Sequence, residues 1–365
     1  MAHAASGPQS GMNYAPSGLG VPVCEPGSFR FAAAGLDHGH IFGMTLGLVQ
    51  AGGTVCAVFD PDPTKVAAYR AQYPEAHPFD SLESLLGDDA IQLVCCAAVP
   101  DQRADIGVKV LESGKHFLAD KPPFTNQSQL DRARETVRRT GKIWAVYYSE
   151  RLHNEAAVHA GSLIRNGAIG RVLNVVGLGP HRLNAATRPP WFFERARYGG
   201  ILADLASHQI EQFLAFAGAD DAAIIHSAVA NFAHPEYPEL EDFGEVHLIT
   251  DSGVTGYFRV DWFTPDGLGI WGDGRVVVLG TDGYFELRKY IDVAGDRSSD
   301  HIFLVDRHNE HHLTVHGTVG FPFFGQLILD CIDGTHHAMD QTYTFRVAEL
   351  SLLAQEHATV LTKNP

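Results

Sequence analysis

The sequence is poor in basic residues. It has 27 Lys and Arg against 43 Asp and Glu, a formal net charge of −16 at pH 7. Nucleic acids and anionic membrane surfaces bind basic footprints, so this balance argues against both as partners. The sequence also lacks an apolar run of about 18 to 20 residues, the length that spans a bilayer. Its first residues, MAHAASGPQSG, lack the charged-then-apolar order of a signal peptide, so the cytoplasm is the expected compartment.

Cysteine is scarce and has no metal or disulfide spacing. The odd total predicts reduced thiols at Cys24, Cys56, Cys95, Cys96 and Cys331. Histidine is plentiful, with 20 residues, which raises a metal-dependent isomerase as one alternative. We nevertheless predict no metal, because the histidines of the polar stretches have no ligand spacing. These are His308, His311, His312, His336 and His337.

The length of 365 residues exceeds the size at which one hydrophobic core keeps growing, which predicts two domains. Residues 1–28 are rich in Gly, Pro, Ser and Ala and form either a disordered or an extended arm. Residues 29–148 alternate short apolar runs with helical patterns, which predicts a doubly wound (Rossmann) α/β domain. Residues 149–365 hold a run of strand patterns, which predicts an α+β domain with a large, mostly antiparallel open sheet. Two late helical patterns pack either on that sheet or on the first domain; they cover residues 324–332 and 343–355.

The first strand-to-helix turn carries part of a dinucleotide fingerprint. The usual pattern is G-x-G-x-x-G, whose glycines let backbone N–H groups approach a pyrophosphate at a helix N-terminus. Here only Gly35 is in register, and Asp37 and His40 stand at the second and third glycine positions. We predict that the turn contacts a dinucleotide through Gly35, Leu36, Asp37 and His38.

Two further strand ends face the same crevice. The strand TVCAVFD ends at Asp60, where an acidic side chain accepts hydrogen bonds from an adenosine ribose and repels a 2′-phosphate. This position favours NAD over NADP as cofactor. The alternative role for Asp60 is a cap of the turn before Pro61. The strand IQLVCCAAV leads to Pro100, which we also expect at the cofactor.

A lysine follows another buried strand. The run HFLAD ends at Asp120, and Lys121 comes directly after it, before two prolines that fix a rigid turn. Side chains at the carboxyl ends of parallel strands point into the ligand crevice. Asp120 and Lys121 are therefore expected beside the cofactor.

The stretch from Tyr198 to Gly218 predicts a buried helix that ends at its last glycine. Asp204 and His208 lie four residues apart in it, so both side chains leave one face. Buried ionisable groups require partners, because stranding them costs several kcal/mol. The pair is either a satisfied core contact or an acid/base pair at the wall of a pocket.

These features together resemble the Gfo/Idh/MocA family of nicotinamide-dependent sugar oxidoreductases. The sequence DKP at 120–122 stands where the family has Glu-Lys-Pro. The sequence GGILADLASH at 199–208 is similar to the family's G-G-x-x-x-D-x-x-x-H. The resemblance implies that Lys121 and His208 serve acid/base and alkoxide-stabilising roles, and that Asp204 orients substrate hydroxyls. The motifs GLDHGH, YSERL and SHQIEQF most resemble the branch that oxidises a ring hydroxyl of glucosides, often at C3.

The implied chemistry is the oxidation of a secondary alcohol. Hydride leaves the carbinol carbon only as the hydroxyl proton is removed, which requires a base in contact with that hydroxyl. Aromatic side chains can stack on a sugar face and polar ones can bond its hydroxyls, although ordinary packing is an equal alternative for each. The expected substrate-binding residues are Tyr148, Arg151, His181, Arg188 and Trp191.

The sequence is also compatible with other functions. Some members of the family oxidise a sugar transiently with bound NAD, eliminate an aglycone and reduce the sugar again, so an NAD-dependent glycosidase is the main alternative. A non-catalytic NAD-binding regulator is another, although it would not need a lysine and a histidine aimed at one crevice. We expect a sugar or glycoside as the small-molecule partner, and a homodimer or homotetramer formed through exposed sheet edges.

Overall fold

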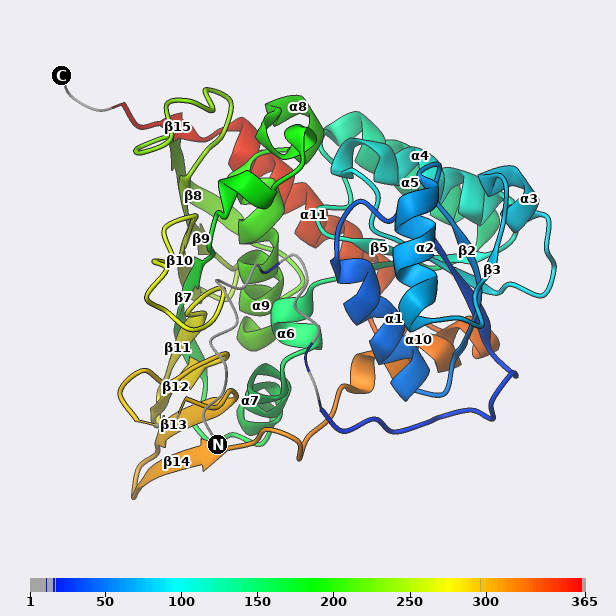
Figure 1. Ribbon diagram of the computed structural model, residues 1–365. Coiled ribbons are helices and arrows are strands. Elements are labelled where there is room, and N and C mark those ends of the chain that lie inside the picture. Colours follow the sequence, from blue (N-terminus) through cyan, green and yellow to red (C-terminus); the bar gives the residue numbers. More distant parts are fainter. Residues whose placement is uncertain (1–10, 12–15, 17, 296, 363–365) are drawn as a thin grey trace.

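The structure is a computed structural model, and the part of the chain that it describes is residues 11, 16, 18–295 and 297–362. The other positions of the predicted arm lie outside the described residues: 1–10, 12–15 and 17. Residues 18–28 run along the surface beside residues 47–51 and residues 319–326 (Figure 1), and the Val23 N–H donates to the Ala51 carbonyl (2.9 Å). None of the described helices is both long and apolar enough to cross a membrane.

The first domain is a six-stranded parallel sheet with helices on both faces (Figure 1). Its strands are β1 (Arg30–Ala34), β2 (Thr54–Phe59), β3 (His77–Pro78), β4 (Leu93–Cys96), β5 (His116–Asp120) and β6 (Trp144–Tyr147). Its helices are α1 (His40–Gln50), α2 (Pro63–Gln72), α3 (Leu82–Leu86), α4 (Pro100–Glu112) and α5 (Gln127–Thr140). The strand order β3-β2-β1-β4-β5-β6 is that of a dinucleotide-binding fold, so the predicted Rossmann domain is confirmed. Strands β4 and β5 are buried along their whole length, as parallel strands covered on both faces must be.

The second domain is a nine-stranded, mostly antiparallel sheet. Its strands are β7 (Val172–Pro180), β8 (Ala223–Ala230), β9 (Phe243–Ile249), β10 (Thr255–Asp261), β11 (Arg275–Gly280), β12 (Tyr284–Arg288), β13 (His301–Val305), β14 (Glu310–Thr314) and β15 (Thr359–Val360). The order is β14-β13-β12-β11-β7-β10-β9-β8-β15, and only the pairs β7–β10 and β8–β15 are parallel. Burial alternates along β9 and β11, so one face packs inward and the other faces outward. The predicted α+β class is confirmed.

Most helices of the second half lie between its sheet and the first domain, whereas α10 lies beside α1 of the first domain (Figure 1). They are α6 (Ser149–Leu152), α7 (Glu155–Arg165), α8 (Arg195–Tyr198), α9 (Ser207–Ala217), α10 (Pro322–Asp333) and α11 (Gln341–Glu356). Short 3₁₀ segments cover Ala185–Thr187 and Pro190–Phe193. The last two helices return to the first domain: the Phe324 ring of α10 lies 6.0 Å from Tyr147, and Gln341 of α11 accepts from the Trp144 N–H (2.8 Å).

The helix predicted between Tyr198 and Gly218 is interrupted near its start. A π-helical turn, Leu202–Ala206, precedes α9, and the helix ends at Gly218 in the left-handed conformation, as predicted. The N–H of Leu202 donates to Gln355 of α11 (2.8 Å), so a distant element shapes this turn. Single π turns inside helices are frequent at functional sites.

Candidate active site

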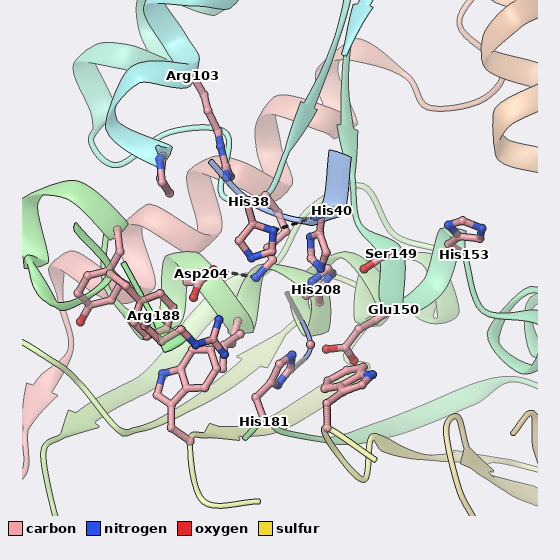
Figure 2. A pocket seen from close by; sticks show the side chains of 18 of the residues that line it. His38, His40, Arg103, Ser149, Glu150, His153, His181, Arg188, Asp204 and His208 are labelled. Atoms are coloured by element: carbon pink, nitrogen blue, oxygen red, sulfur yellow. Dashed lines mark hydrogen bonds and ion pairs between the residues drawn. The ribbon is translucent and has the colours of Figure 1, made fainter. Parts of the chain in front are cut away.

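A cavity lies where the carboxyl ends of β4 and β5 face α6, the π turn and α9 (Figure 2). Its described lining is Gly11, Pro16, His38, His40, Pro100, Arg103, Lys121, Ser149, Glu150, His153, His181, Arg188, Trp191, Phe192, Tyr198, Asp204, Leu205, His208, Trp262, Trp271 and Tyr290. The predicted site residues in this lining are His38, Pro100, Lys121, His181, Arg188, Trp191, Asp204 and His208. The other predicted site residues lie outside it: Gly35, Leu36, Asp37, Asp60, Asp120, Tyr148 and Arg151.

Lys121 and Asp204 form an ion pair in the cavity. Lys121 Nζ donates to Asp204 Oδ1 at 2.7 Å, and the two side chains are 4% and 12% exposed. The lysine comes from the end of β5 and the aspartate from the π turn, so the contact joins the two domains. Each charge compensates the other, which a buried ion requires.

His208 is a neutral imidazole in the wall of the same cavity. Burial lowers its pKa well below the usual range, the Glu150 carboxylate opposes that shift, and Lys121 adds to it. Its Nδ1 is buried and has no hydrogen-bond partner among the described residues. The Tyr148 ring packs edge-on behind it at 6.3 Å, which explains why Tyr148 supports the cavity without lining it. An unprotonated ring nitrogen is what a general base needs.

The sequence did not point to a buried ion pair beneath His208. Lys289, which follows β12, donates to Glu150 Oε2 of α6 at 2.5 Å, and Gln209 donates to the same oxygen at 2.8 Å. Burial would raise the pKa of Glu150, but Lys289 and the nearby His208 and His181 lower it to about 2. Glu150 Oε1 is buried without a partner among the described residues. A fixed carboxylate therefore stands beside the histidine, and protonation of His208 would be favoured by its charge.

Asp120 binds neighbouring groups of the protein and does not line the cavity. It is fully buried and accepts from Arg103 Nη2 (3.0 Å), His40 Nδ1 (2.8 Å) and the Lys121 N–H (2.8 Å). Burial would raise the pKa of Asp120, but His40, Arg103 and His38 hold it well below its usual range. It therefore positions the residues around it, and we do not assign it a direct contact with the cofactor.

Two groups of side chains have the donor types of a metal site. The first is His38, His40 and Asp120; the second is Glu155, Asp300 and His316. In the first, the Arg103 guanidinium already pairs with the carboxylate. In the second, Glu155 accepts from the backbone amides of Gly317, Val319 and Gly320. The carboxylates that a cation would need are thus already held by N–H donors, so we assign no step to a metal.

The predicted substrate side chains divide into two groups. His181, Arg188 and Trp191 reach the cavity from the loops after β7. His181 Nδ1 donates to the Gly179 carbonyl (3.1 Å), which leaves Nε2 free to accept, and burial lowers its pKa to about 4. Arg151 instead forms an ion pair with the buried Glu211 and does not line the cavity, so we leave it out of the proposed site.

The turn after β1 retains the close approach that a dinucleotide needs. Gly35 has φ +74°, and a Cβ there would lie 2.6 Å from Ala98 Cβ, so only glycine fits. At the start of the α1 helix that follows, the His40 N–H donates to His38 Nδ1 (3.2 Å), and the N–H groups of Ile41 and Phe42 donate to the carbonyls of His38 and Gly39. Asp37, at the second glycine position, is neutralised by Lys65 (2.6 Å). Gly35 thus keeps the tight turn of the dinucleotide fingerprint, while the amides of Leu36 and His38 are held by acceptors of the protein.

Asp60 takes the alternative role left open by the sequence. Its carboxylate accepts from the N–H groups of Leu36 (2.6 Å) and Asp62 (2.9 Å), and its side chain is 1% exposed. It therefore ties the turns after β1 and β2 together. The preference for NAD over NADP remains a proposal.

Family models match both domains. Residues 30–148 match the model described as "Oxidoreductase family, NAD-binding Rossmann fold", and residues 158–286 match the "GFO/IDH/MocA C-terminal domain". The chain belongs to the Gfo/Idh/MocA family. The resemblance read from DKP and GGILADLASH is thus confirmed at the level of the family.

Individual family members show what the chain is similar to. The scyllo-inositol 2-dehydrogenase (NADP(+)) IolW of Bacillus subtilis is 24% identical over 184 residues, 50% of this chain and 49% of that protein. A crystal structure of a "putative oxidoreductase" from Erwinia carotovora atroseptica is 44% identical with a TM-score of 0.89, covering 92% of this chain and all of that one. A levoglucosan dehydrogenase in complex with NADH and levoglucosan has a TM-score of 0.75 at 16% identity, covering 90% and 97%, and shows the shared fold alone. The chain spans about half the length of the curated relatives it matches.

Proposed function

We propose that the protein is an NAD-dependent oxidoreductase that oxidises a secondary ring hydroxyl of a sugar or glycoside, with C3 of a glucoside as the first candidate. The observation that carries this proposal is the grouping of a neutral histidine and a Lys121–Asp204 ion pair in one cavity at the carboxyl ends of β4 and β5. A relative named as an inositol dehydrogenase and a structural neighbour named as a levoglucosan dehydrogenase support the substrate class.

In the proposed mechanism, a bound nicotinamide supplies the hydride acceptor. His208 accepts the proton of the substrate hydroxyl, and Glu150 stabilises the imidazolium that results. Lys121 stabilises the developing alkoxide, and Asp204 holds both Lys121 and a neighbouring hydroxyl. The enclosure of these groups strengthens each electrostatic contact relative to water.

The charges near the end of β2 are the reason for proposing NAD, and not NADP, as the cofactor. Asp37 and Asp60 place two carboxylates there, and Lys65 is the basic partner of both, at 2.6 and 3.8 Å. The local charge is then negative, which opposes the 2′-phosphate of NADP. The named cofactors of the relatives do not decide the point, because one is named with NADP(+) and another was crystallised with NADH.

The test is NADH formation across a panel of sugars and glycosides, followed by absorbance, with NAD and NADP compared in parallel. We expect NADH to accumulate with at least one neutral or acidic sugar, and NAD to give the higher kcat/KM. Release of an aglycone without net NADH would indicate the NAD-dependent glycosidase instead. Binding of NAD without any turnover across the panel would contradict both enzymatic readings.

A further inference from the structure

The charges of the cavity do not balance. Two cations in its wall have acidic partners, since Lys121 pairs with Asp204 and Arg103 with Asp120. A third cation, Lys289, lies behind the wall and pairs with Glu150. A fourth cation, Arg188, is 8% exposed, and no acidic side chain of the described residues lies within ion-pair distance of it. The carboxylate that acts on its charge from farther away is Asp204, which is already paired with Lys121. A buried cation without an ion-pair partner is costly unless solvent hydrates it or a ligand brings a negative charge.

The Arg188 guanidinium is held in place by neutral groups. Its Nε donates to the Leu183 carbonyl (2.7 Å) and its Nη2 to the Arg182 carbonyl (3.1 Å). It lies over the rings of Phe192 (4.5 Å) and Trp262 (5.1 Å). These contacts use two of its five N–H donors, and Nη1 has no hydrogen-bond acceptor among the described residues. The side chain is thus held in place while some of its N–H donors lack an acceptor among the described residues.

The Arg188 donors that have no acceptor among the described residues face the cavity in which a sugar would lie. Figure 2 shows Arg188, His181 and Glu150 directed toward the same space as Asp204 and His208. The charge of Arg188 persists at neutral pH, since burial lowers its pKa only to about 10. The molecule as a whole carries a net charge of −16, so an unpaired cation in its cavity is a local exception. A cavity that contains an unpaired cation favours a ligand that carries a negative charge.

We propose that the substrate of this site is a sugar acid, whose carboxylate binds Arg188 while its ring hydroxyl is presented to His208. This inference rests on the proposed oxidoreductase function and names its substrate class. A carboxylate fits better than a phosphate because one planar guanidinium matches its two oxygens, whereas Arg188 has no second unpaired cation beside it to share a dianion. Trp191 and Trp262 supply aromatic surface for the sugar ring.

Binding assays can isolate this charge, because three tryptophans line the cavity and report ligand binding by fluorescence. The probes are matched acids and neutral amides: D-glucuronate with D-glucuronamide, and D-galacturonate with D-galacturonamide. D-glucose 6-phosphate tests the phosphate alternative. In the unmodified protein with NAD present, we expect at least one acid to bind about 10-fold or more tightly than its amide.

Two variants separate charge from packing. Arg188→Met keeps the aliphatic stem and should weaken the acid by about 10- to 100-fold while changing the amide little. Arg188→Lys should retain part of the preference for the acid. If Arg188 only clamps its loop, acid and amide will weaken together and the melting temperature will fall in both variants.

The outcomes also distinguish this inference from the function on which it rests. Equal binding of acid and amide, failure of every acid to bind, or tighter binding of the phosphate would each overturn the sugar-acid proposal. NADH formation from neutral sugars would then leave the oxidoreductase function standing. Conversely, an Arg188-dependent preference for an acid without NADH formation would uphold the binding site and contradict the redox function.

Discussion

Glu150 contributes both to the proposed chemistry of His208 and to the stability of the fold. Glu150→Gln removes the charge that favours protonation of His208, so we expect kcat to fall by at least about 10-fold, while KM changes little. The same change leaves Lys289 buried without its ion-pair partner, which costs about 3 to 5 kcal/mol of folding stability. A single variant therefore mixes both effects.

The double variant Glu150→Gln with Lys289→Met resolves them. It removes both buried charges and should recover much of the lost melting temperature, while kcat stays low. Wild-type kcat in a folded double variant would show that Glu150 only supports the fold. A pH profile adds a second readout: because Glu150 raises the pKa of His208, its loss should move the acidic limb of kcat to lower pH.

The sequence alone was sufficient to predict Lys121, Asp204 and His208 as candidate site residues. Lys121 follows a buried strand, and Asp204 and His208 share a helix, so local pattern alone brings each to a crevice or a buried face. Glu150 and Lys289 are 139 positions apart, and only the packing of α6 against the end of β12 joins them. The one local signal was an acidic residue two positions after the apolar run WAVYY.

At the scale of the elements, the π turn sets where Asp204 lies. Gly200 precedes it at φ +96°, and a Cβ there would lie 2.3 Å from Gln355 Oε1, which accepts from the Leu202 N–H. Gly200→Ala should therefore lower stability by more than the about 1 kcal/mol of an unfavourable φ, and should also lower kcat by displacing Asp204.

Gly253→Ala is the matched control for this prediction. Gly253 has φ +84° in an exposed turn with nothing within 4 Å of an added Cβ, so it carries the backbone cost without the clash. Gly200→Ala should therefore have both a lower melting temperature and a lower kcat than Gly253→Ala. Equal losses of melting temperature with unchanged kcat would show that the turn does not position the site.

The helix around Asp204 also marks the limit of prediction for elements. Its apolar spacing and terminal glycine were enough to predict a helix that ends at Gly218. The π turn depends on side chains of β9 and α11 neighbours, such as Gln355, that no local window contains. For the same reason the return of α10 and α11 to the first domain could be listed as an option but not chosen from the sequence.

At the scale of the whole molecule, the outer face of the large sheet carries apolar side chains. Tyr257, Val277, Leu279 and Tyr284 are 38% to 45% exposed, and strand register places Val277 in one row with Tyr257 and Leu279 opposite Tyr284. Contiguous exposed apolar surface of this kind marks association sites. We predict a homodimer or homotetramer that covers this face with a second copy of the chain.

Sedimentation velocity checks the assembly. The double variant Val277→Lys with Leu279→Lys should shift the protein toward the monomer. The melting temperature of the monomeric form should not fall. Ile225→Lys, which changes an exposed apolar residue of β8 away from these rows, is the control. A monomer in the unmodified protein at all concentrations would contradict the prediction.

In the proposed function, His208 accepts the proton and Lys121 stabilises the developing charge during the oxidation of an alcohol. The most direct test of these roles is the turnover number for NADH formation at saturating NAD and sugar, measured for the unmodified protein, His208→Ala and Lys121→Ala. We predict losses of about 10² to 10⁴ for each variant, with unchanged NAD affinity. His208→Ala should unfold at a near-native temperature, whereas Lys121→Ala should unfold at a lower temperature because it leaves the buried Asp204 without its ion-pair partner. Near wild-type turnover in a folded His208→Ala protein would contradict the role of His208.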